Sequence, residues 1–110
     1  MTTLTKNGDT HVLTIEGELN KSAVADFQKL VDQAVGEDAR DFVVDFTDCT
    51  GLDSTALEAL TRLHRETQER LGMCKLCMLS ETMEKIFEIT RLNSELDICV
   101  TFEEALAALK

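Results

Sequence analysis

The stretch DFTDCTGLDSTAL, residues 45–57, decides the fold because it leads from a buried strand into a long helix. It continues the apolar run 42–44 and crosses a polar segment in which Gly51 is expected to let a loop turn back above the strand. The helix then opens on the pair Ser54 and Thr55. A hydroxyl at a helix N-terminus meets unpaired backbone N–H groups and the positive end of the helix dipole. Ser54 can therefore cap the helix or carry a phosphate.

Outward from this stretch, the hydrophobic pattern alternates between the period of a strand and that of a helix. Strands are expected over residues 2–6, 11–16, 42–46, 75–79 and 98–100, with a hairpin turn at 7–9 between the first two. Helices are expected over residues 21–36, 55–71, 81–90 and 102–109, capped at the first, third and fourth by Asn20, Ser80 and Thr101. The helix over 55–71 should bury one stripe that includes Leu71 and should end at Gly72.

Strands followed by helices need crossover connections, so the later strands should run parallel with helices packed on the sheet. The sequence thus predicts one α/β domain over residues 1–110, with a mixed, mostly parallel sheet of about four to five strands and about four helices. A response-regulator receiver has a similar order of elements. A receiver needs a pair of acids after its first strand and a lysine near its last strand, but here the first strand ends in Glu16-Gly17-Glu18, and no lysine follows Val100 before Lys110.

Composition narrows the class of partner. The chain has 110 residues, of which 44% are hydrophobic, and a formal net charge of -10. Nucleic acid and anionic membrane surfaces are unfavourable partners for such a charge, whereas a basic protein would be attracted. No basic segment followed by an apolar run resembles a signal peptide, and no apolar stretch is long enough for a membrane span. We therefore expect a cytoplasmic protein.

The four cysteines are expected to be reduced and structural. Cys74 and Cys77 form a C-x-x-C, but residues three apart on a strand point to opposite faces, so their sulfurs should not converge on a metal. Cys49 could be oxidised if its segment exposes it. The neighbouring acids Asp45, Asp48 and Asp53 could in principle bind a divalent cation, but no metal and no cofactor is expected.

The pattern Asp45, Asp53-Ser54-Thr55, a small residue and Leu57 resembles the signature loop of the STAS-domain anti-sigma factor antagonists. Three further segments resemble the same family over nearly the whole chain. These segments are 17–20 before the first long helix, 87–92 followed by Ile98, and 102–106 at the C-terminal helix. Two positions depart from the family pattern: Asn20 replaces Asp, and Ala56 replaces Gly.

The resemblance implies a STAS fold and a binding function. In this family the serine that matches Ser54 is phosphorylated by a partner that is both anti-sigma factor and ATP-dependent serine kinase. The unmodified protein would capture that partner and free a sigma factor, the phosphorylated protein would let go, and a phosphatase is a possible further partner. The residues expected to contact the partner are Asn20, Asp48, Asp53, Thr55, Glu58 and Arg62.

Several of these residues also have a purely structural interpretation. Asp53 is either a carboxylate favoured by the helix dipole or a group that orients the serine hydroxyl or contacts the kinase, and Asp45 either joins this patch or bonds the loop. On the outer face of the helix, Glu58–Arg62, Arg62–Glu66 and Arg65–Glu69 have the spacing of ion pairs.

Intrinsic catalysis is not expected. Ser54 has no histidine near it in sequence, and the G-x-S-x-G motif of hydrolases is absent. His64 lies two to three turns further along the helix and is interpreted as a residue at the edge of the core. The alternative function is a STAS subunit that scaffolds a membrane transporter or a stressosome-like signalling complex, with Ser54 acting only as a cap.

Overall fold

Strands and helices alternate along the chain after an N-terminal hairpin, in a computed structural model that describes residues 1–109. The strands are β1 (Thr2–Asn7), β2 (Thr10–Leu19), β3 (Asp41–Leu52), β4 (Cys74–Cys77) and β5 (Asp97–Cys99). The helices are α1 (Lys21–Gly36), α2 (Ser54–Glu69), α3 (Glu81–Ile89) and α4 (Phe102–Ala108), with a short 3-10 helix, η1 (Leu92–Ser94), before β5. The predicted α/β class and the predicted order of elements are confirmed.

The five strands form one mixed sheet in the order β1-β2-β3-β4-β5. β1 and β2 are antiparallel and meet at a two-residue turn, where Gly8 has a φ of +63°, which a residue without Cβ adopts easily. The pairs β2–β3, β3–β4 and β4–β5 are parallel, as the crossover argument predicted. The carboxyl ends of the parallel strands therefore share one edge of the sheet.

The segment after Phe46 is not the loop that the sequence predicted. β3 continues to Leu52, and its second half pairs with the end of β2, where Asp48 lies opposite Glu16 and Leu52 opposite Leu19. The register shifts twice along this pair, which accommodates the irregular polar sequence. Gly51 lies within this ladder without a left-handed φ, so it does not serve as the turning residue that we expected.

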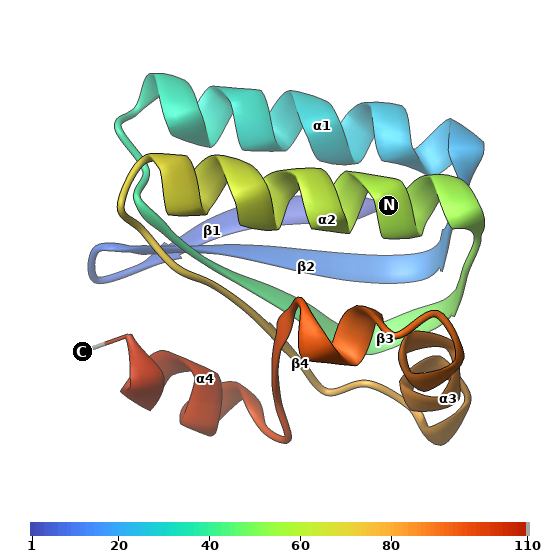
Figure 1. The fold of residues 1–110 in the computed structure, drawn as a ribbon. Coiled ribbons are helices and arrows are strands. Elements are labelled where there is room, and N and C mark those ends of the chain that lie inside the picture. Colours follow the sequence, from blue (N-terminus) through green and yellow to red (C-terminus); the bar gives the residue numbers. More distant parts are fainter. Residues whose placement is uncertain (110) are drawn as a thin grey trace.

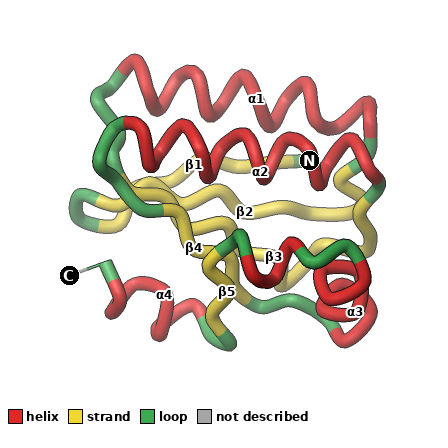
Figure 2. The backbone as a smooth tube through the Cα atoms, in the orientation of Figure 1, coloured by secondary structure: helices red, strands yellow, loops and turns green. Residues whose placement is uncertain are grey.

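The helices lie on both faces of the sheet (Figure 1, Figure 2). α1 and α2 run side by side over one face, and their buried residues join those of α3 in the main core with Phe42, Val44 and Leu76. α4 covers the opposite face, where Ala105 packs with Val43 in a smaller cluster. Among residues 1–109, none of the helices combines the length and the apolar character that crossing a bilayer requires.

The end of α2 departs from the predicted core stripe. Leu71 has a φ of +61° and is 85% exposed, so it lies outside the core. The Leu71 N–H donates to Gln68 and the Gly72 N–H to Thr67, which is the hydrogen-bond pattern of a left-handed helix cap. Gly72 follows the cap because an added Cβ would lie 1.9 Å from the Arg40 carbonyl oxygen. The helix ends before Gly72 as predicted, but the residue with the left-handed φ at its end is Leu71.

Candidate functional site

Two helix N-termini meet at the carboxyl edge of the sheet. β2 ends at Leu19 and leads into α1, while the neighbouring strand β3 ends at Leu52 and leads into α2. Both connections lie at the same side of the molecule, at the right of Figure 1. In parallel sheets this edge is where ligands and partners commonly bind, because helix N-termini and connecting segments converge there.

Asp53 joins the two helices through its carboxylate. One oxygen, Oδ1, accepts from the Ala56 N–H at 2.9 Å and caps α2, while Oδ2 accepts from the Lys21 N–H at 2.9 Å at the start of α1. The Asp53 N–H also donates to the Leu19 carbonyl at 3.4 Å. A carboxylate that receives two backbone N–H groups at helix N-termini is favoured by charge-assisted hydrogen bonding and by both helix dipoles.

Ser54 is the first residue of α2 and does not cap it. The sequence allowed Ser54 or Thr55 to open the helix as a cap, but the capping residue is Asp53. The Ser54 side chain is exposed, and within residues 1–109 its hydroxyl has no hydrogen-bond partner. Thr55 and Glu58 have the spacing of a capping box but do not form one, because both residues lie inside the helix.

Asn20 occupies the equivalent position on α1. Its Oδ1 accepts from the Ala23 N–H at 3.1 Å and from the Ser22 hydroxyl at 3.2 Å, which confirms the predicted N-cap. Its amide lies 3.5 Å from the Glu18 carboxylate. Asn20 and Asp53 both line a shallow pocket of about 150 Å³ between the two strand ends, so the structure brings these two predicted site residues together.

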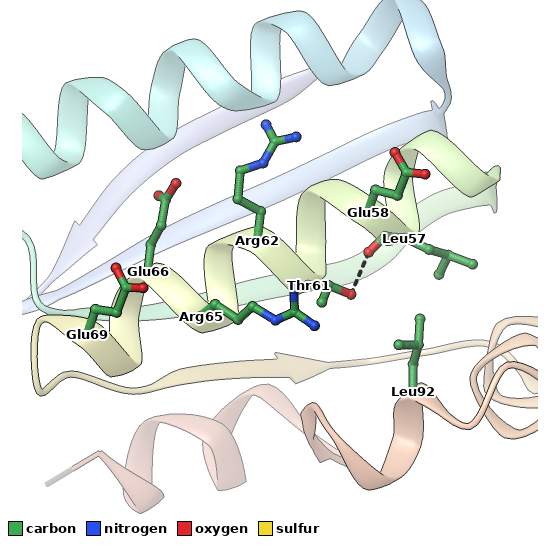
Figure 3. Close-up of a pocket in the computed structure, with 8 residues that line it drawn as sticks. All are labelled: Leu57, Glu58, Thr61, Arg62, Arg65, Glu66, Glu69 and Leu92. Carbon is green, nitrogen blue, oxygen red and sulfur yellow. Dashed lines mark hydrogen bonds between the residues drawn. The ribbon is translucent and has the colours of Figure 1, made fainter.

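A larger groove of about 700 Å³ runs along the outer side of α2 (Figure 3). At the end near the helix N-terminus, Leu57 and the η1 residue Leu92 point toward each other and give the groove an apolar floor. Charged side chains from α2 line the rest of it, including the predicted contact residues Glu58 and Arg62. The groove begins one helical turn from Ser54.

The charged side chains of α2 do not pair along the helix as predicted. Within residues 1–109 the ion pairs shorter than 4 Å are Arg65–Glu95, at 3.0 Å, and Lys75–Asp97, at 3.4 Å. The three predicted pairs on α2 are not formed, and Arg65 instead reaches across the groove to Glu95 in the segment after η1. Glu58 and Arg62 are both exposed and make no ion pair within the described residues.

The remaining predicted acids lie further from Ser54. Asp48 is exposed on β3 opposite Glu16, four residues before Leu52, or roughly 13 Å at the rise of a strand. Asp45 accepts from the Thr47 N–H at 2.9 Å and from its hydroxyl at 2.6 Å, so its role is to bond the local backbone. No group of three metal-binding side chains occurs among residues 1–109.

The cysteines are free thiols, and the C-x-x-C splits between the two faces of the sheet as predicted. Cys74 belongs to the main core, and Cys77 to the cluster beneath α4. Cys49 is buried, 7% exposed, so its segment does not present it to solvent. His64 is also buried, deeper than the edge position that we expected.

Sequence reasoning did not identify several groove residues. Leu57 was noted only as part of the motif, and Leu92 only as part of the segment 87–92. Arg65 and Glu95, which are 30 residues apart, form the ion pair across the groove. Leu57, an apolar residue one turn into an amphipathic helix and partly buried in the structure, was a usable signal. Nothing in the sequence could have placed Leu92 beside it.

Comparison with known proteins gives the family. A model of the STAS domain matches residues 2–105. No curated protein matches the chain. A solved structure of the anti-sigma factor antagonist SpoIIAA in its unphosphorylated form is 22% identical, with a TM-score of 0.77, and the match covers 98% of this chain and 96% of that one.

Two further structures are similar over nearly their whole length. The Bacillus cell fate determinant SpoIIAA in the phosphorylated form is 24% identical, with a TM-score of 0.77 and complete coverage of both chains. An anti-sigma factor antagonist from Mycobacterium paratuberculosis is 19% identical, with a TM-score of 0.83 and coverage of 99% of this chain and 92% of that one. These structures share the fold, and the family model shows that the chain belongs to the STAS domain family.

Proposed function

We propose that this STAS domain is a cytoplasmic anti-sigma factor antagonist controlled by phosphorylation of Ser54. The unmodified protein binds an anti-sigma factor that is also an ATP-dependent serine kinase, and a sigma factor is released. Phosphorylation of Ser54 ends this binding, and a phosphatase restores it. The domain itself works by binding and does not catalyse a reaction.

The observation that carries the proposal is the division of roles between Asp53 and Ser54. Asp53 caps α2 and holds the start of α1, so the fold does not need the Ser54 hydroxyl. That hydroxyl is exposed at the first position of the helix, where a kinase can reach it. A phosphate at this position is favoured by the helix N-terminus, so the modified domain keeps its fold.

The groove beside Ser54 supplies a surface for the partner. Its apolar floor at Leu57 and Leu92 offers contact area, and Glu58 and Arg62, which make no ion pair within residues 1–109, can pair with charges of the partner. Thr55 is partly exposed between Ser54 and this groove. With a net charge of -10, the domain attracts a partner that is basic overall.

Phosphorylation would change this surface by its charge. A phosphoserine adds about -1.5 to -2 charges at pH 7. The added charge would lie beside Asp53 and near the Glu18 carboxylate at the strand ends. An acidic group of the partner that docks over the free hydroxyl would then be repelled and left unpaired, which weakens binding. SpoIIAA, which shares the fold, has been solved both with and without phosphate.

The proposal is tested by incubating the domain with ATP, Mg²⁺ and a purified anti-sigma factor kinase that binds it, and by measuring its intact mass. We expect a gain of about 80 Da, equal to one phosphate, in the native protein. Ser54→Ala should show no gain, whereas Thr5→Ala, a control that removes an exposed hydroxyl on β1, should still gain one phosphate.

Binding without phosphorylation would contradict the switch. If the native protein bound the kinase tightly but gained no phosphate, the scaffold function in a transporter or signalling complex would fit better. A gain that survives in Ser54→Ala would place the modification on another residue and would also contradict the proposal.

A further inference from the structure

The register of the sheet places two cysteines directly opposite each other. Cys77 on β4 pairs with Cys99 on β5, and β4 and β5 are parallel. Both side chains lie on the face that α4 covers, where Cys99 packs against the cluster that contains Cys77. Neighbouring strands are about 4.8 Å apart, which falls within the range of Cα separations of about 4.4–6.8 Å that disulfides span.

No other pair of cysteines in this chain can meet in the folded state. Cys74 is three residues from Cys77 and faces the main core on the other side of the sheet. Cys49 also faces the main core, and it lies four residues beyond Asp45, the residue on β3 that pairs with Cys77. Four residues of strand correspond to roughly 13 Å, too far for a disulfide.

The surroundings of the two thiols make them slow to react in the folded protein. Burial, followed by the charge of Asp45, raises the pKa of Cys77 to about 12, and burial, followed by the charge of Glu104, raises the pKa of Cys99. Because the thiolate is the form that attacks a disulfide, exchange in the folded protein should be slow at neutral pH. Cys77 is fully buried and Cys99 is partly exposed, so Cys99 is the thiol that an oxidant reaches first.

We propose that Cys77 and Cys99 are a modification site, where a small-molecule disulfide such as oxidised glutathione converts the two thiols into a cross-strand disulfide. The Cys99 thiolate attacks one glutathione sulfur, which forms a mixed disulfide and releases one reduced glutathione. The Cys77 thiolate then attacks the Cys99 sulfur and releases the second. Cys77 and Cys99 together lose two electrons and two protons, and one oxidised glutathione becomes two reduced molecules.

The disulfide would link β5, at the edge of the sheet next to the groove, covalently to β4. β5 has only three residues in its ladder and is the last strand at this edge. η1, which carries Leu92, and Glu95, which pairs with Arg65, directly precede β5. Linking β5 covalently to β4 would therefore restrain the segment that forms one wall of the groove, and it would do so whether or not Ser54 is phosphorylated.

The test needs only the domain itself. The folded protein is incubated with oxidised glutathione, quenched with acid and denatured, and its free thiols are counted. We expect the count to fall from four to two, with a loss of about 2 Da and a tryptic fragment in which residues 76–85 are joined to residues 92–110. The rate should rise about tenfold from pH 7 to pH 8, because the thiolate fraction does so below the pKa.

Two variants identify the pair. Cys74→Ser should still lose two thiols, whereas Cys99→Ser should keep all three of its thiols. Circular dichroism of each variant checks that it is folded, and the fragment analysis of the native protein stands even if a variant is not. Native protein that keeps four thiols, that keeps a glutathione adduct on Cys99, or that forms a link through Cys49 or Cys74 would overturn the proposal.

Discussion

At the scale of the residue, Asp53 caps α2 and leaves the Ser54 hydroxyl free for the modification that we propose. The Asp53 carboxylate accepts backbone N–H groups from both α1 and α2, so the local fold depends on it. Ser54 follows it with an exposed hydroxyl that the fold does not use. The phosphate that we propose for Ser54 would therefore not require the helices to rearrange, which suits a reversible surface switch.

Removing the Asp53 carboxylate should destabilise the domain. Asp53→Ala loses the cap of α2 and the acceptor for the Lys21 N–H, so we expect the free energy of unfolding to fall by about 2 kcal/mol. Asp53→Asn keeps one acceptor oxygen for the Ala56 N–H and should lose roughly half as much. Urea denaturation measures both, and an Asp53→Ala variant as stable as the native protein would contradict this role.

Local sequence rules predicted the N-caps of α1, α3 and α4 but not the N-cap of α2. Asn20, Ser80 and Thr101 were predicted because each stands alone before a helical pattern and accepts from the N–H three residues later. Asp53, Ser54 and Thr55 are adjacent and can each cap a helix, so a local rule cannot choose among them. The choice depends on the Lys21 N–H, which lies 32 residues away in the chain.

At the scale of the element, the end of β3 shows why its length was underestimated. Apolar residues predicted the strand only as far as Phe46, because the following residues are mostly polar. The segment is nevertheless held in the sheet by its pairing with Glu16 to Leu19 at the end of β2. That pairing is non-local, and two shifts of register hide it from any simple alternation pattern.

Alanine should be far more destabilising at Gly72 than at Gly51. Gly72→Ala places a Cβ against the Arg40 backbone, so we expect a loss of roughly 2 to 3 kcal/mol in the free energy of unfolding. Gly51→Ala meets nothing closer than the Glu18 Cγ at 3.8 Å and should change stability by less than about 1 kcal/mol. Thermal unfolding distinguishes them, and equal losses would show that the close approach at Gly72 relaxes freely.

At the scale of the whole molecule, distant segments assemble the proposed contact surface. The groove takes Leu57 from α2 and Leu92 from η1, and the Arg65–Glu95 pair crosses it. The resemblance of the motif pointed to the region around Ser54. The wall of the groove that η1 forms depends on the positions of β4 and β5 in the sheet relative to α2. Sequence patterns predicted the class of fold and the order of its elements, while side-chain partners across 30 residues required the structure.

The buried thiols make stability depend on alkaline pH. Burial, followed by the charge of Asp97, raises the pKa of Cys74 from 9.0 to about 12, and that of Cys77 also reaches about 12. Between pH 9 and about pH 12, the unfolded chain binds fewer protons than the folded protein. The free energy of unfolding should therefore be fully retained below pH 9 and fall above it, by about 1.4 kcal/mol per pH unit for each thiol.

Urea denaturation of the reduced protein from pH 8 to pH 11 measures this dependence. Cys74→Ala removes one of the thiols whose pKa is raised and should make the decline above pH 9 shallower by about 1.4 kcal/mol per pH unit. The variant is less stable at every pH because of the cavity it leaves. Identical slopes in the native protein and the variant would show that Cys74 does not titrate as its burial implies.

The central claim is that one phosphate on an exposed serine changes the affinity of this surface for its partner. It is tested most directly by calorimetric measurement of the Kd of the anti-sigma factor kinase for the native domain and for the domain phosphorylated on Ser54. We predict a Kd at least about tenfold higher for the phosphorylated form, equal to about 1.4 kcal/mol or more. Equal affinities of the two forms would contradict the account.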